Sequence, residues 1–219
     1  KPQVKICGNA VAVGDINGST IYVFNASGAM GSIDTSLNIA QIEVTSQGLV
    51  AAVLEDNEAN YINLYNASGE KIYSVKTSLS GDGYPLDISV SEDGTKLMAS
   101  YLYVSGESMK TNVVFYNFSD VGQNETERIV GGFNHYNDTI VGDVFFMDNK
   151  TAVAVGENVI SIYKIKEYPK LYKEITIDNA IERVFFSSEH IGIVQKNEES
   201  GDVYKLAVYN TSGSRVCQT

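Results

Sequence analysis

The sequence predicts an all-β fold, specifically a β-propeller of about five four-stranded antiparallel blades. A strand pattern recurs every ~40–50 residues, which is the usual length of a propeller blade, and turn motifs recur at similar intervals. In addition, no apolar stripe with the helical period persists over three turns, so a helical bundle is not the expected fold.

The clearest unit spans residues 84–120. Apolar and polar residues alternate over 86–90, which is the period of a β-strand. The turn Ser91-Glu-Asp-Gly94 follows, with short polar residues and a glycine that can adopt positive φ. Two further strands are expected over 96–104 and 111–118, because these segments are rich in apolar, β-branched and aromatic residues.

The third strand of each unit carries an aromatic anchor. The anchors are Phe24, Tyr65, Tyr116, Tyr163 and Tyr209, with separations of 41, 51, 47 and 46 residues. Near-constant spacing indicates equivalent positions in successive blades. We therefore expect all five anchors to pack between neighbouring sheets.

The 219 residues are expected to form one domain, since there are only 3 Pro and nothing resembles a linker. The predicted blades span residues 1–36, 37–78, 82–136, 137–178 and 179–219. The first predicted strand is an innermost strand and the last is an outermost strand, so no strand from one terminus completes the blade at the other terminus. We therefore expect an open arc or a ring closed without strand exchange. An incomplete part of a larger, seven- to eight-bladed propeller is a further alternative.

The formal net charge is −11 and the pI is near 4.6. Binding to nucleic acid requires clustered Lys and Arg, and no basic cluster is present, so nucleic-acid binding is not expected. Anionic membrane surfaces are disfavoured for the same reason. The two cysteines, Cys7 and Cys217, allow either one long-range disulfide or two free thiols.

The segment Ile88–Leu97 resembles the S-x-D-G-x-x-L phrase of bacterial WD40-like and TolB-like propellers. More widely, residues 82–102, 113–122 and 130–133 resemble an uncharacterised family of propeller proteins from Firmicutes. The resemblance implies a single N-terminal membrane anchor, preceding these residues, and an extracytoplasmic, cell-surface location. It implies no reaction, since none is assigned to the family.

Few residues suggest catalysis or metal binding. His135 and His190 have no histidine partner at metal-ligand spacing, and both are expected in loops. The sequence Asp15-Ile-Asn-Gly resembles the start of a Ca²⁺ loop, but no bidentate Glu follows at the required distance. We therefore predict no catalytic residue, no metal site and no cofactor.

Five residues occupy equivalent positions on the innermost strands, near the axial channel. This channel row is Gln3, Gln41, Asp87, Asp143 and Arg183. An ion pair between Asp143 and Arg183 is expected if their blades are neighbours. The alternative function is a carbohydrate-active enzyme or glycan-binding propeller, in which Asp87 and Asp143 would supply paired carboxyls in the channel.

Acidic residues are concentrated in the loops between second and third strands. This acidic loop face consists of Asp15, Glu55, Asp56, Glu58, Glu107, Glu157, Glu198, Glu199 and Asp202. Clustered like charge steers partners of opposite charge. The leading prediction is a non-catalytic, extracytoplasmic binding or scaffold module, which uses this face to bind an unidentified protein partner.

Overall fold

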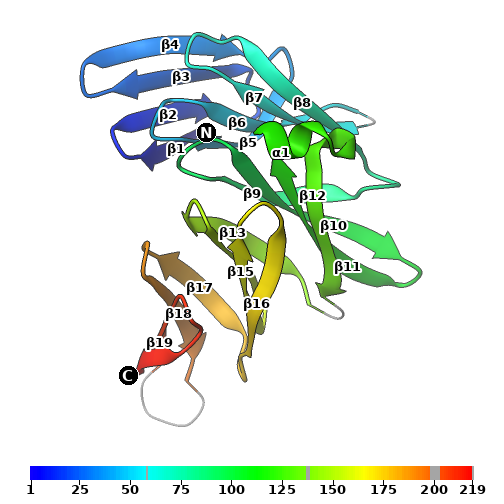
Figure 1. Cartoon of the computed structure of the whole chain (residues 1–219), viewed down its shortest axis with the longest axis vertical. Coiled ribbons are helices and arrows are strands. Elements are labelled where there is room, and N and C mark those ends of the chain that lie inside the picture. The colour runs from blue at the N-terminus through cyan, green and yellow to red at the C-terminus, as the bar shows by residue number, and fades with distance from the viewer. Residues whose placement is uncertain (58, 137–138, 198–202, 219) are drawn as a thin grey trace.

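The computed structural model describes residues 1–57, 59–136, 139–197 and 203–218. Within them the chain forms five four-stranded antiparallel sheets (Figure 1). Each sheet consists of four consecutive strands, paired in chain order. The predicted fold class is therefore confirmed. We call the sheets blades 1 to 5 in chain order.

The strands have the following bounds. Blade 1 contains β1 (Pro2–Cys7), β2 (Ala10–Asp15), β3 (Thr20–Asn25) and β4 (Gly28–Asp34). Blade 2 contains β5 (Asn38–Val44), β6 (Val50–Glu55), β7 (Ala59–Tyr65) and β8 (Lys71–Ser78). Blade 3 contains β9 (Tyr84–Val90), β10 (Lys96–Ser105), β11 (Ser108–Asn117) and β12 (Ile129–Tyr136). Blade 4 contains β13 (Val141–Asp148), β14 (Thr151–Gly156), β15 (Val159–Ile165) and β16 (Pro169–Thr176). Blade 5 contains β17 (Ile181–Phe186), β18 (His190–Lys196), β19 (Tyr204–Asn210) and β20 (Arg215–Gln218).

The aromatic anchors occupy equivalent positions, as the repeat predicts. In every blade the register between the third and fourth strands shifts at the anchor, where a bulge changes the pairing. Each anchor also lies opposite an apolar residue of the second strand, for example Val50 opposite Tyr65 and Ala152 opposite Tyr163.

Four of the anchors are buried against the preceding blade. Tyr65, Tyr116, Tyr163 and Tyr209 are at most 8% exposed, and each belongs to an apolar cluster shared with the blade before it. Two of the anchor hydroxyls bond to a second tyrosine: the Tyr116 hydroxyl is 2.8 Å from the Tyr101 hydroxyl, and the Tyr163 hydroxyl bonds the Tyr136 hydroxyl.

The first anchor departs from the prediction, because Phe24 is 36% exposed. Blade 1 has no preceding blade among the described residues, so nothing covers the face on which Phe24 lies. The repeat fixed the position of this side chain, but its burial depends on a neighbouring sheet. The prediction that all five anchors pack between sheets is therefore wrong for Phe24.

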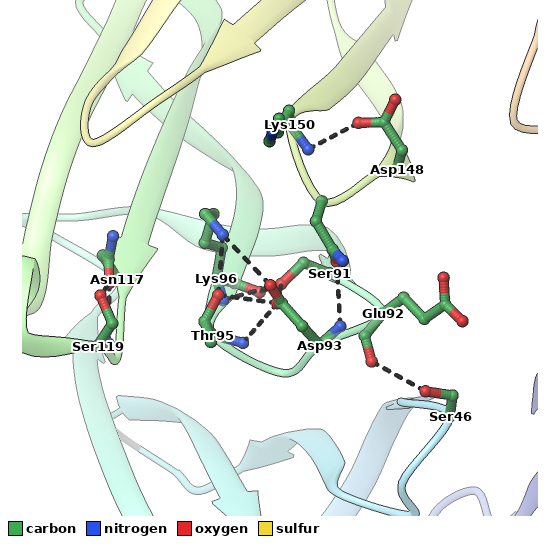
Figure 2. Close-up of polar contacts among 11 residues, drawn as sticks. Ser46, Ser91, Glu92, Asp93, Thr95, Lys96, Asn117, Ser119, Asp148 and Lys150 are labelled. Atoms are coloured by element: carbon green, nitrogen blue, oxygen red, sulfur yellow. Dashed lines mark hydrogen bonds and ion pairs between the residues drawn. The ribbon is translucent and has the colours of Figure 1, made fainter.

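The Ser91–Lys96 turn joins three blades at one end of the sheets (Figure 2). Within the turn, Asp93 accepts hydrogen bonds from the Ser91 hydroxyl and from the amide and hydroxyl of Thr95. These donors lower the pKa of Asp93, although its partial burial acts in the opposite direction. Between blades, the Ser46 hydroxyl donates to the Glu92 carbonyl and the Asp93 amide donates to Asn149 Oδ1.

Two short helical segments interrupt blade 3. They are α1 (Asp120–Gln123) and a 3₁₀ turn, η1 (Thr126–Arg128). Both are too short to show apolar residues at the helical period in the sequence. Glu127 lies in this turn with φ of 53°, and the outer strand of blade 3 begins at Ile129. None of the described helices has the length and apolarity needed to span a membrane.

The two histidines are on strands rather than in loops. His135 lies within β12 and its Nε2 is 3.0 Å from Glu174 Oε2 of the neighbouring blade. His190 is the first residue of β18. Short polar neighbours around both residues suggested loops. His190 nevertheless pairs with Asn210, and His135 lies at a bulge of β12, between the paired residues Phe133 and Tyr136.

Candidate functional site

Sheet topology brings the described part of the acidic loop face to one end of the blades. The turn between the second and third strands always lies beside the start of the first strand: Asp15 pairs with Pro2, and Glu55 with Asn38. Glu107 and Glu157 lie in the corresponding turns of blades 3 and 4. Four members of the face, Glu58, Glu198, Glu199 and Asp202, lie outside the described residues.

Most described members of the acidic loop face are open to water. Asp15 has one partner there, the N-terminal ammonium of Lys1, at 3.6 Å. Glu55 accepts a hydrogen bond from the Tyr84 hydroxyl at 2.5 Å. Among the described residues, Asp56 accepts only from the neighbouring Asn57 amide. The weak internal pairing of Asp15 and Asp56 leaves their carboxylates available to another molecule.

The two ends of the blades differ in charge. The turns between second and third strands, and the connections from one blade to the next, contain no Lys or Arg. At the opposite end the turns also carry acidic residues, but Arg128, Lys150 and Lys166 compensate part of their charge. Like charges without compensation add to a negative potential, so the field is strongest at the end that bears the acidic loop face.

Two depressions lie at or near this end. One, of about 380 Å³, is lined by residues 36–38 and 55–57, including Glu55 and Asp56. The other, of about 210 Å³, lies between blades 4 and 5 and is lined by Asp143, Glu157 and Glu182 together with Arg183. The first depression offers little apolar surface, so it suits a polar, cationic side chain better than an apolar one. The second also has apolar lining, from Ile140, Val155, Ile181 and Val184.

The channel row joins neighbouring blades by hydrogen bonds. Gln3 Oε1 accepts from the Ile42 amide of blade 2 at 2.8 Å. Gln41 donates to Asp87 Oδ1, and Asp87 Oδ2 accepts from the Val144 amide of blade 4 at 2.7 Å. Asp87 thus contacts the blades on both sides. Burial raises its pKa to about 6, despite these donors.

A second carboxylate near the channel was missed by the sequence analysis. Glu43 lies two residues after Gln41 on β5 and forms an ion pair with Lys5 of β1. Its side chain is 19% exposed, and burial raises its pKa to about 7 against the opposing effect of Lys5. The sequence contains a signal for this ion pair, because Lys5 and Glu43 each lie two residues after a member of the channel row and therefore share its strand face.

The predicted ion pair between Asp143 and Arg183 is not formed. The two side chains line the same depression, yet neither takes part in an ion pair of the described residues. Arg183 is exposed, and water solvates an exposed guanidinium well enough that fixing it in one geometry gains little. Partial burial raises the pKa of Asp143, and the positive charge of Lys5 opposes this rise.

These contacts give Asp87 a structural role. Both of its oxygens already accept hydrogen bonds from neighbouring blades, so it is not poised to attack a substrate or to transfer a proton. No observation supports the alternative of a carbohydrate-active enzyme. Across the described ranges, no group of three or more His, Cys, Asp or Glu is arranged to hold a metal ion. Cys7 and Cys217 are free thiols on blades 1 and 5.

The sequence matches one family model along its entire length, residues 1–219. The chain belongs to this family, DUF5711, which is a family of unknown function. No curated protein matches the sequence significantly.

Solved β-propellers share the fold at low sequence identity. KlAtg21, in a complex with the coiled coil of AgAtg16, aligns with a TM-score of 0.68 and 16% identity over 100% of this chain and 70% of its own. The propeller domain of the Trilobed protease from Pyrococcus furiosus aligns at 0.58 and 15%, over 95% of this chain and 67% of its own. Hsv2 from Kluyvelomyces marxianus gives 0.58 and 14%, over 80% of this chain and 60% of its own. This chain therefore spans about 60–70% of these propellers, and the likeness concerns the fold alone.

Proposed function

We propose that this chain is a non-catalytic binding or scaffold module that uses the acidic loop face to bind a cationic segment of a protein partner. The observation that supports this proposal most directly is the charge asymmetry. Asp15, Glu55, Asp56, Glu107 and Glu157 extend from one end of the blades, where the loops contain no Lys or Arg.

The opposite end is a weaker candidate. There the polar groups of the Ser91–Lys96 turn bond to neighbouring turns, and basic residues offset part of the acidic charge. At the acidic loop face, by contrast, carboxylates line two depressions. Flexible Lys or Arg side chains would enter them and replace water at the carboxylates.

A structurally similar protein supports protein binding by this architecture. KlAtg21 was solved with the coiled coil of AgAtg16 bound to it. A propeller offers such partners a rigid surface, because its loops are positioned by packed sheets. The identity of the partner, the extracytoplasmic location, the preceding membrane anchor and the single-domain organisation remain predictions.

The test uses a fluorescent oligolysine peptide as the probe and an oligoglutamate peptide as its counterpart. Binding is measured by anisotropy for the unchanged chain and for a double variant, Asp56→Lys with Glu157→Lys. The control variant carries Glu92→Lys with Glu189→Lys, which makes the same change in net charge at the opposite end of the blades. All four residues are exposed, so each variant should fold.

We expect the chain to bind oligolysine and not oligoglutamate, and added salt to weaken the binding through screening. The Asp56/Glu157 variant should lose at least about tenfold in affinity, whereas the control should lose much less. Equal losses in the two variants would show that only net charge matters, and the acidic loop face would then not be a docking surface.

A further inference from the structure

A pocket of about 270 Å³ lies between blades 2 and 3, and no described residue of the acidic loop face lines it. The floor of this blade 2–3 pocket is buried: Val75, Tyr101 and Tyr116 line it and are 6%, 2% and 3% exposed. Its rim carries two exposed carboxylates, Asp82 and Glu127. Pockets for drug-sized ligands usually measure about 300–1,000 Å³, so this one suits a small chemical group.

Comparison with the next blade explains why space remains at this position. In blade 4 the anchor Tyr163 bonds the hydroxyl of Tyr136, a large side chain that reaches it from the preceding blade. In blade 3 the anchor Tyr116 instead bonds Tyr101, which belongs to its own sheet. The preceding blade contributes smaller side chains to the pocket, such as Val75.

The pocket offers more hydrogen-bond acceptors than donors. Asn112, which lines it, has a buried Oδ1 without a hydrogen-bond partner among the described residues. A buried acceptor without a partner is costly, so this atom calls for a donor from a molecule in the pocket. The hydroxyls of Tyr101 and Tyr116, which we call the hydroxyl pair, share one hydrogen bond at 2.8 Å. Lone pairs on both oxygens therefore remain free, and a single O–H donor is left over.

The charge at the rim is negative and is not compensated within the pocket. Burial is the main reason that the pKa values of the hydroxyl pair are raised, and the charges of Asp82 and Glu127 raise them further. Both carboxylates thus act on the hydroxyl pair, and neither forms an ion pair with a described residue. Lys76 is the basic residue of the described lining, but its ammonium lies over the Tyr61 ring, 5.9 Å from the ring centroid, on the side of blade 2 that packs against blade 1.

The backbone of η1 holds Glu127 at the rim. Glu127 and Arg128 have φ of 53° and 59°, in the left-handed region that residues other than glycine seldom adopt. Such strain concentrates at functional sites. Arg128 points elsewhere: it donates to the Phe118 carbonyl at 3.3 Å, and its guanidinium lies 5.2 Å from the centroid of the Tyr73 ring. The turn therefore presents its negative side chain to the pocket and directs its positive one away.

We propose that the blade 2–3 pocket binds a primary alkylammonium group, supplied either by a free amine or by a lysine side chain of a partner. An ammonium has three N–H donors and no acceptor, which matches the unpaired Asn112 Oδ1 and the free oxygens of the hydroxyl pair. Aromatic rings and the carboxylates at the rim attract its positive charge, and Val75, Val114 and Ile129 contact the alkyl stem. An anionic ligand would add negative charge at the rim and leave Asn112 Oδ1 unpaired. The lysine source rests on the proposed function, and the free amine does not.

The test titrates the isotope-labelled chain with pentylammonium in two-dimensional NMR, and uses pentanol and pentanoate as the neutral and anionic counterparts. The side-chain amide signal of Asn112 reports binding in the pocket. Gly132→Leu blocks the pocket, because Gly132 lines it and a Cβ added there would meet no atom within 4 Å. Gly142→Leu is the matched control, since Gly142 has the same free space on β13 of blade 4. Circular dichroism checks that both variants fold.

We expect pentylammonium to shift the Asn112 signal saturably, and pentanol and pentanoate to bind at least about tenfold more weakly, because hydrogen bonds to a charged donor are stronger. Gly132→Leu should lose the shift and Gly142→Leu should retain it. A missing shift, equal affinity for pentanol, unchanged binding by Gly132→Leu or an equal loss in Gly142→Leu would each overturn the proposal.

A titration with oligolysine distinguishes the two sources of the ammonium. If Gly132→Leu weakens oligolysine binding as well, the ligand is a lysine of the partner. If oligolysine binding is unchanged while pentylammonium binding is lost, the ligand is a free amine, and either result supports the site. The variant Asp56→Lys with Glu157→Lys should still bind pentylammonium, because neither residue lines the pocket. Loss of pentylammonium binding by the unchanged chain would therefore leave the proposed function standing.

Discussion

The ionisation of Glu43 should make the stability of this protein fall as pH rises from 5 to 8. Glu43 is largely buried beside Lys5, and its pKa is raised from 4.5 to about 7. A carboxyl whose pKa is raised by folding binds a proton more tightly in the folded state than in the unfolded state. Its contribution to stability is therefore complete below pH 4.5 and is lost as pH rises through 7.

The size of the effect follows from the pKa values. One pKa unit corresponds to about 1.4 kcal/mol, so ionised Glu43 costs the folded state up to about 3 kcal/mol at pH 8. Asp87 changes stability in the same direction, because its pKa rises from 3.8 to about 6. Repulsion among the many other carboxylates also increases with pH, so a comparison between variants is needed.

The assay is urea unfolding at pH 5, 6, 7 and 8, followed by far-ultraviolet circular dichroism. Glu43→Gln removes the titrating group and keeps its shape, so its unfolding free energy should fall less with pH than that of the unchanged chain. Asp56→Asn, at an exposed carboxylate, is the control and should retain the full pH dependence. If Glu43→Gln and Asp56→Asn show the same slope as the unchanged chain, the burial argument for Glu43 is wrong.

Three further predictions concern packing between blades. Tyr163→Ala should destabilise the chain by about 3–5 kcal/mol, whereas Phe24→Ala should cost about 1–2 kcal/mol, because only Tyr163 is fully buried; equal losses in chemical denaturation would contradict this. Asp87→Ala should cost about 2–3 kcal/mol by leaving Gln41 and the Val144 amide unpaired, and Asp87→Asn should cost much less at pH 8, which thermal melts would compare. In hydrogen exchange, amides over residues 3–34 and 181–217 should exchange before those of blades 2 to 4, since blades 1 and 5 each have one neighbouring blade among the described residues; uniform protection would refute this.

Much of the fold was predictable from local pattern. Strand alternation and turn motifs depend on backbone geometry over a few residues, and repetition makes each weak signal count five times. The anchors at Tyr65, Tyr116, Tyr163 and Tyr209 and the turn at Ser91–Gly94 were therefore found without a structure. The one-turn helix near Asp120 was not predicted, because four residues are too few to show a helical period.

What the tertiary structure decided is how residues from different blades meet. By itself, the sequence determined the repeat, the fold class and which positions are equivalent, because these depend on short-range periodicity. It could not determine that Phe24 is exposed while Tyr163 is buried, that Glu43 pairs with Lys5, or that Asp143 and Arg183 stay unpaired. Burial, pKa and pairing depend on side chains roughly 40 residues away in sequence, whose distances and desolvation are fixed only when the sheets pack against one another.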